Sequence, residues 1–332
     1  MASVPLSILD LAAVGEDESI AESLAGTVLL AQSAERAGYR RVWYAEHHNI
    51  ASIASSATAV LIAHVAASTS TIRLGAGGVM LPNHSPLVIA EQFGTLATLH
   101  PGRIDLGLGR APGSDQAAAR ALRRDPRAAE RFAEDVVELQ GLLSDESPLP
   151  GIRAIPGQGT HVPLYILGSS LFGAQLAASL GLRYAFASHF APQALQEAAQ
   201  TYRERFEPSP QLDSPYLMAG VGVIAAETTA EAEKQLEATR RARAKSLFSR
   251  GDRRLTDEEV EALLGSPQGA AVDEMLTHTA MGTPEDAAAY LDRFQALSGA
   301  DELITVHYAN SVADRARSVE LLAGAAEPAG RG

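Results

Sequence analysis

The sequence predicts an α/β protein in which residues 1–332 form a single domain folded as a (β/α)8 barrel. The chain has 332 residues and is 46% hydrophobic. This is enough for a large core, and α/β barrels of this length are single domains. Apolar strand-like segments alternate with helical segments along the whole chain, and eight such units make a barrel. A doubly wound open sheet is the alternative, but the absence of a break between two halves favours the closed barrel.

Each predicted strand is a short apolar run that ends at glycine or polar residues. The first, residues 4–12, lacks clean alternation, as expected for a strand buried on both faces. The other predicted strands are residues 41–45, 72–74, 104–108, 162–167, 184–187, 216–225 and 302–307.

The predicted helices carry apolar residues at helical spacing and recognisable ends. The first follows an acidic cluster at residues 16–18, which suits a helix dipole, and Gly38 ends it. Thr283 and Pro284 form a typical helix start before residues 285–297. The other predicted helices are residues 52–68, 86–99, 127–143, 172–180, 192–206, 229–246 and 312–322.

Residues 248–273, after the seventh strand, form an excursion rich in charged residues and glycine, with one short helical piece at 257–264. An excursion of this length in a compact domain is typical of a lid, so we expect it to be mobile when no ligand is bound. The arginine-rich residues 240–254 have acidic neighbours on both sides. They are interpreted as a solvated helix end or loop.

Composition excludes several classes of protein. A formal charge of −13, with no basic stretch suited to nucleic acid, argues against a nucleic-acid partner. No apolar run is long enough for a membrane span, and the first residues do not resemble a signal peptide. The chain has no cysteine, which fits a cytoplasmic protein and removes thiolate chemistry.

Candidate functional residues follow the predicted strands, and in a barrel these strand ends meet at the active-site face. Arg110 comes after the fourth strand, and Leu167, Gly168, Ser169 and Ser170 lead from the fifth strand into a helix. An arginine beside helix N-terminal amides and hydroxyls is suited to a phosphate. The alternative is that the two serines only cap the helix.

Histidines at strand ends are the candidates for acid–base chemistry. His47 and His48 follow Glu46 after the second strand, and their spacing is not that of a metal site. A neutral imidazole acting as general base near pH 7 is the simpler interpretation. Glu46, His189 and His307 all follow strands and are candidates for lining a substrate pocket, although each of these two histidines taken alone is more often a packing residue.

Four stretches together resemble the bacterial luciferase-like family of flavin-dependent monooxygenases, in particular its oxidoreductases of secondary metabolism. They are WYAEHHN at 43–49, LGAGGVMLPNHSP at 74–86, HPGRIDLGLGRAPG at 100–113 and GTPED at 282–286. The resemblance covers nearly the whole chain and implies the same barrel fold. It places the catalytic histidine at His47, a non-proline cis peptide beneath the flavin at Gly77 and Gly78, and the phosphate-binding arginine at Arg110.

The resemblance also implies the reaction. FMN would bind as FMNH2 supplied by a separate NAD(P)H-dependent flavin reductase, and O2 would form a flavin peroxide. One oxygen atom would enter a small organic substrate, such as a secondary-metabolite intermediate or an aldehyde, and the other would leave as water. The family also implies a homodimer formed through the helices after strands two and three, and the small residues of 52–68 suit such packing.

Two departures concern the cofactor pocket. Bacterial luciferase has a cysteine where this chain has Gly109, and a glutamate and a serine where it has Ser169 and Ser170. The phosphate site is therefore expected to be kept, whereas light emission from an aldehyde is not implied. The alternatives are a deazaflavin-dependent dehydrogenase and a non-catalytic FMN-binding protein; a protein that only binds FMN has no need of a base at His47.

Overall fold

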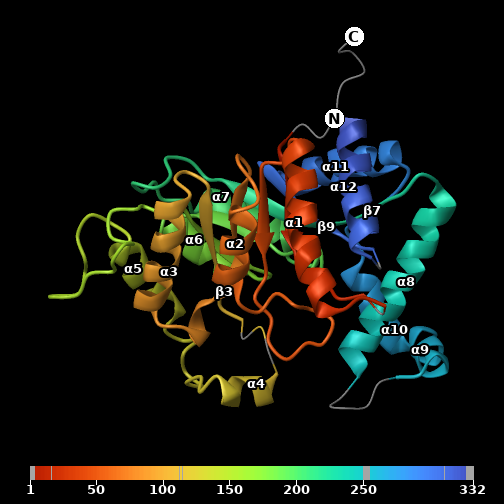
Figure 1. Ribbon diagram of the computed structural model, residues 1–332, viewed down its shortest axis with the longest axis horizontal. Helices are drawn as coiled ribbons and strands as arrows, with labels where there is room; N and C mark the ends of the chain where they lie inside the picture. Colours follow the sequence, from red (N-terminus) through yellow and green to blue (C-terminus); the bar gives the residue numbers. More distant parts are fainter. Residues whose placement is uncertain are drawn as a thin grey trace, which may run out of the picture.

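A computed structural model describes residues 4–15, 17–111, 113, 115–249, 255–309 and 311–326, and it confirms the predicted (β/α)8 barrel (Figure 1). Eight parallel strands form a closed ring, because they pair in the order β6-β5-β4-β3-β2-β1-β9-β7 and β6 also pairs with β7. The strands of the ring are β1 (Leu6–Asp10), β2 (Arg41–Tyr44), β3 (Arg73–Met80), β4 (Ile104–Gly109), β5 (Leu164–Gly168), β6 (Arg183–Phe186), β7 (Leu217–Ala225) and β9 (Glu302–His307).

Helices cover the outside of the ring, and the largest apolar cluster fills the space between them and the strands. A capping box between Ser19 and Glu22 starts α1, and a second between Thr283 and Asp286 starts α11. The helices are α1 (Ile20–Arg36), α2 (Thr58–Ala66), α3 (Pro86–Leu99), α4 (Gln116–Ala121), α5 (Phe132–Leu142), α6 (Leu171–Ser179), α7 (Leu195–Glu204), α8 (Thr229–Phe248), α11 (Pro284–Ser298) and α12 (Val312–Ala326), with a 3-10 turn at Leu81–Asn83. None of the described helices is both long and apolar enough to cross a bilayer.

The third strand is longer than the sequence predicted. The glycine cluster was expected to follow a strand ending at residue 74, but β3 continues to Met80 and contains a cis peptide bond between Gly77 and Gly78. A Cβ atom on Gly77 would lie 2.7 Å from Leu9 Cδ1, and one on Gly78 would lie 2.8 Å from the Gly107 carbonyl oxygen. These glycines are therefore needed for close packing within the strand and not for a turn.

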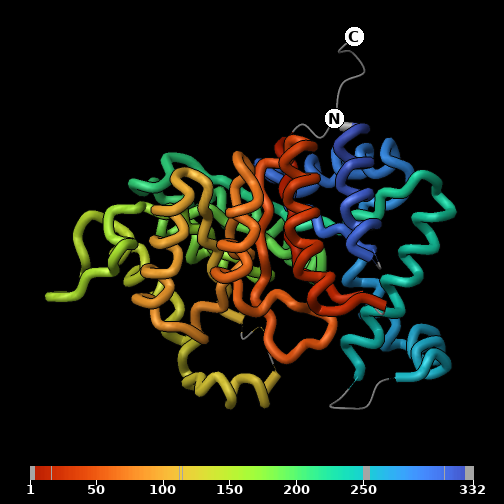
Figure 2. Tube along the Cα trace, viewed as in Figure 1, coloured from red at the N-terminus to blue at the C-terminus, as the bar shows by residue number. Residues whose placement is uncertain are grey.

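The excursion after β7 is more regular than predicted. The expected helical piece is α9 (Asp257–Leu264), and the sequence did not predict α10 (Pro267–Met275) or β8 (Thr279–Gly282). Strand β8 pairs with the end of β7 outside the closed ring. Helices α9 and α10 pack against α8 through Ala244, Val260, Val272 and Leu276, and Figure 2 shows them together at one side of the barrel. Residues 250–254 of the predicted lid lie outside the described residues, and the mobility of the segment stays a prediction.

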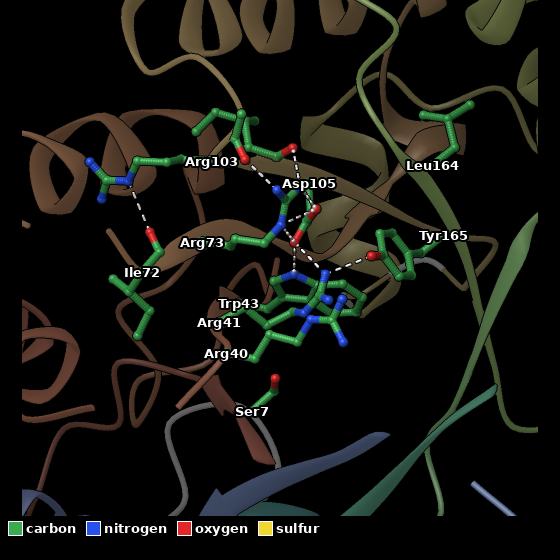
Figure 3. Close-up of polar contacts among 12 residues, drawn as sticks. Ser7, Arg40, Arg41, Trp43, Ile72, Arg73, Arg103, Asp105, Leu164 and Tyr165 are labelled. Carbon is green, nitrogen blue, oxygen red and sulfur yellow. Dashed lines mark hydrogen bonds and ion pairs between the residues drawn. The ribbon is translucent and has the colours of Figure 1, made fainter. Parts of the chain in front are cut away.

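Charged residues fill the barrel interior at the amino ends of the strands (Figure 3). Arg41 and Arg73 both contact the Asp105 carboxylate, with Arg41 Nη1 2.6 Å from Asp105 Oδ2. Arg41 Nη2 also donates to Glu302 Oε2 at 3.1 Å, and Tyr165 Oη lies 2.6 Å from Arg41 Nη1. Both carboxylates are fully buried, and such charges are tolerated inside a protein only when they are paired. This end of the barrel is therefore structural, which leaves the opposite end for a ligand.

Candidate active site

Glu46 fixes the end of β2 against the segment that follows β3. Its carboxylate accepts hydrogen bonds from the Met80 amide, His48 Nε2 and His84 Nε2, each at 2.9 Å. Burial raises the pKa of the Glu46 carboxyl. The hydrogen bonds from His84, His48 and the Met80 amide, together with the charge of His84, outweigh burial and leave this pKa below its usual range. The carboxylate is 1% exposed. Glu46, a predicted pocket residue, therefore acts through its neighbours. Its partner His84 was not among the candidate residues predicted from the sequence.

His47 lies partly buried beside this network. Its amide donates to the Ser55 carbonyl at 2.9 Å, so the loop before α2 holds its backbone. Burial lowers the pKa of His47 below 6.5, while the Gly113 backbone and Glu46 act in the opposite direction. The imidazole is therefore neutral at pH 7 and able to accept a proton. Of the adjacent histidines, His48 bonds to Glu46, whereas His47 interacts with the Gly113 backbone.

The strands next to His47 present an unusually bare backbone. The cis peptide implied at Gly77 and Gly78 is present, directly beside Gly107 on β4. A Cβ atom on Gly107 would lie 2.6 Å from Leu167 Cδ1, which places Leu167 against the same surface. Backbone without side chains allows a flat ring system to approach closely.

The structure brings Arg110 to the start of α6. Arg110 Cζ lies 4.0 Å from the centroid of the Phe172 ring, and Phe172 is the second residue of that helix. Ser170 is the N-cap residue, but its side chain makes no capping hydrogen bond, so the cap-only interpretation of the two serines is not supported for Ser170. Ser169 precedes it and is exposed, and Gly168 ends β5. A guanidinium group, free helix amides and hydroxyls therefore lie together, as a phosphate site requires.

His189 lies on the inner face of β7. A Cβ atom on Gly220 would lie 2.4 Å from His189 Nδ1, and one on Gly222 would lie 2.4 Å from Tyr308 Cε2. The two glycines therefore make room for two rings at the end of the barrel that holds His47. Tyr308 Oη donates to the His189 carbonyl at 3.2 Å, and Arg243 of α8 donates to Tyr308 Oη.

His307 does not join this group, contrary to the expectation that it could line the pocket. Its Nδ1 lies 2.8 Å from Ser318 Oγ on α12, and its ring packs edge-on against Tyr39. The residue is 6% exposed, and burial lowers its pKa to about 3. It is a packing residue between the barrel and its helices. Side chains alternate along a strand, so the next residue, Tyr308, faces inward; this alternation is the signal that could have identified it.

Comparison with known proteins agrees with this geometry. The family model for luciferase-like monooxygenases matches residues 4–301. The Bacillus subtilis protein YvbT is 48% identical over 321 residues, covering 96% of this chain and 95% of YvbT. A B. subtilis N-acetyl-S-alkylcysteine monooxygenase is 40% identical over 240 residues, covering 70% of this chain and 71% of that protein.

Solved structures show the same fold. Apo-MsnO8 is 37% identical and superposes with a TM-score of 0.86, covering 99% of this chain and 100% of its own. Two structures at 14% and 15% identity, both with a TM-score of 0.71 and with almost complete coverage, show the fold alone. They are a Pseudomonas putida 3,6-diketocamphane monooxygenase in complex with FMN and an F420-dependent secondary alcohol dehydrogenase with an F420-acetone adduct. By the match of its model over almost the whole chain, this protein belongs to the luciferase-like monooxygenase family.

Proposed function

We propose that this protein is an FMNH2-dependent monooxygenase that inserts one atom of O2 into a small organic substrate. The observation that carries the proposal is the placement of Arg110 at the amino end of α6. That arrangement matches the phosphate of FMN, and the glycine backbone at Gly77 and Gly78 offers a bare surface for the flavin ring on the neighbouring strand. When bound, the reduced flavin supplies the electrons that activate oxygen.

The residues of the chain then have separate roles. Arg110, Ser169 and Ser170 bind and orient the phosphate, and Leu167 packs beside the ring. His47 is neutral at pH 7 and accepts or returns a proton at its ring nitrogen while the substrate reacts. Glu46 positions His47 by tying the end of β2 to the Met80 amide. In the overall reaction, substrate, O2 and FMNH2 give oxygenated substrate, water and FMN.

Labelled oxygen tests this proposal. N-acetyl-S-alkylcysteines are the first substrates to try, because a relative is named for its activity on them. The protein is supplied with FMNH2, an N-acetyl-S-alkylcysteine and heavy-isotope O2, and the product mass is measured. One labelled atom in the product is expected. A panel of thioethers, ketones and aldehydes that all fail to take up label, with FMN bound, would favour the non-catalytic alternative.

The deazaflavin-dependent dehydrogenase is the second candidate, because an F420-dependent enzyme has the same fold. Such an enzyme would transfer hydride without using O2, so its product would contain no labelled oxygen. Reduction of F420 by an alcohol under anaerobic conditions would support it against the monooxygenase.

The partners follow from the proposed reaction. A separate flavin reductase that uses NAD(P)H would deliver FMNH2, and the protein would act in the cytoplasm as a homodimer. Helices α2 and α3 are the proposed contact, and Val60 and Val88 on their outer faces are 70% and 43% exposed. Sedimentation of the purified chain tests the dimer, and a Val60→Asp variant should shift it to monomer.

A further inference from the structure

The rings of His189 and Tyr308 lie on the inner face of β7 and connect the barrel to α8. Gly220 and Gly222 provide the space, since a Cβ atom on either would lie 2.4 Å from a ring atom. Tyr308 also packs against apolar residues of the barrel interior and of the α8–α10 excursion. The two rings therefore form a built surface on the inner face of β7, next to the excursion.

Arg243 supplies a positive charge to this surface. It is partly buried, donates to Tyr308 Oη, and has its Cζ 4.7 Å from the centroid of the Tyr308 ring. Within the described part of the chain, no carboxylate lies within ion-pair distance of it. Its neighbours on α8 differ, because Arg240 pairs with Asp273 and Arg241 pairs with Glu261 at 2.7 Å for each pair.

His189 adds unused hydrogen-bonding capacity. Its Nδ1 is buried without a partner, and neither ring nitrogen bonds to another described residue. Buried polar atoms in native proteins nearly always have a partner, so an unpartnered one near a cation that has no carboxylate partner among the described residues indicates a ligand. Burial, together with the positive charge of Arg243, lowers the pKa of His189 to about 3, so the ring is neutral and one of its nitrogens can accept a hydrogen bond.

We propose that Arg243 anchors a carboxylate of the substrate, with His189 and Tyr308 beside the bound acid and its tail directed toward His47. A guanidinium group matches a carboxylate through two parallel hydrogen bonds. Arg243 is the one cation among the described contacts of Tyr308, and a single guanidinium group suits a monoanion better than a phosphate dianion. The inference rests on the proposed monooxygenase and assigns its substrates to the organic monoacids.

Binding of matched acids and amides tests the anchor. The probes are N-acetyl-S-benzylcysteine and its primary carboxamide, titrated by calorimetry into the protein loaded with oxidised FMN. We expect the acid to bind at least about tenfold more tightly than its carboxamide, because charge-assisted hydrogen bonds contribute a free energy of this size. In Arg243→Gln the preference should disappear. In Arg243→Lys it should return in part, because the charge remains without the planar fork.

Arg241→Gln is the matched control, because it removes the same charge from the same helix at a residue already paired with Glu261. It should keep the preference for the acid. Equal affinity for acid and amide in the unmodified protein, no binding of either at millimolar concentration, or a preference that survives Arg243→Gln would each overturn the anchor. If Arg243→Gln does not fold, the acid and amide affinities of Arg243→Lys and of the unmodified protein still test the anchor.

The two proposals fail separately. A protein that binds FMN and incorporates labelled oxygen but shows no preference for acids refutes the anchor alone. A protein that prefers acids through Arg243 but incorporates no label refutes the monooxygenase and leaves an acid-binding site.

Discussion

Removing the charge of Arg110 should weaken FMN binding without affecting riboflavin, which is the same flavin without the phosphate. A hydrogen bond to a charged group contributes about 1.5–3 kcal/mol. Because Arg110 is exposed, its contribution should be near the lower figure, which corresponds to a roughly tenfold weaker FMN complex in Arg110→Gln. The centroid of the Phe172 ring lies 4.0 Å from Arg110 Cζ and holds the guanidinium group in place. Phe172→Leu should therefore weaken the free energy of FMN binding by about 0.5–1 kcal/mol.

Flavin fluorescence quenching measures both dissociation constants in each variant. Arg153→Gln, which changes an exposed arginine in the loop before β5, is the control and should alter neither constant. An equal loss of FMN and riboflavin affinity in Arg110→Gln would show that the arginine acts on the ring or on the fold. Unchanged FMN affinity would refute the phosphate site.

Three further changes test the account. His47→Gln should lower turnover by about 10²–10⁴-fold and leave FMN affinity unchanged. Because burial keeps the pKa of His47 below 6.5, the unmodified enzyme should lose activity only as the pH falls below that value. A loss of activity that begins at a higher pH would contradict the role of His47 as a base. Arg41→Met should lower the free energy of unfolding in urea by about 3–5 kcal/mol, because it removes the buried cation that Asp105 and Glu302 share and leaves these carboxylates with the partly exposed Arg73 and Arg40. A loss below about 1 kcal/mol would mean that water reaches the two carboxylates. Gly78→Ala should lower the melting temperature, since its Cβ would lie 2.8 Å from the Gly107 carbonyl oxygen, whereas Gly324→Ala in open space should not.

The sequence predicted the barrel well because its signals are local. Strand segments, helix caps such as Thr283 and the polar residues after each strand can all be recognised from neighbours in the chain. The capping box at Thr283 and the helix end at Gly38, which has a φ of +78°, are at the expected residues. The resemblance to the family added the position of the cis peptide.

The errors concern contacts between residues far apart in sequence. The third strand was predicted to end before the glycines of β3, because the reason for these glycines is the closeness of Leu9 and Gly107, which only the closed ring creates. His307 was a candidate for lining the pocket, with packing as the alternative, and the strand turns its side chain outward and Tyr308 inward. Arg243 looked like one of several solvated arginines, and only the fold separates it from Arg240 and Arg241 by giving it Tyr308 as a partner.

The most direct test of the central claim is rapid mixing of the anaerobic protein–FMNH2 complex with oxygenated buffer while flavin absorbance is followed. The account predicts that the protein changes the course of oxidation, so that a species distinct from both reduced and oxidised flavin persists before FMN appears. Addition of a substrate should then shorten its lifetime. Oxidation to FMN with the same single-step course and rate as free FMNH2 would contradict oxygen activation by this protein.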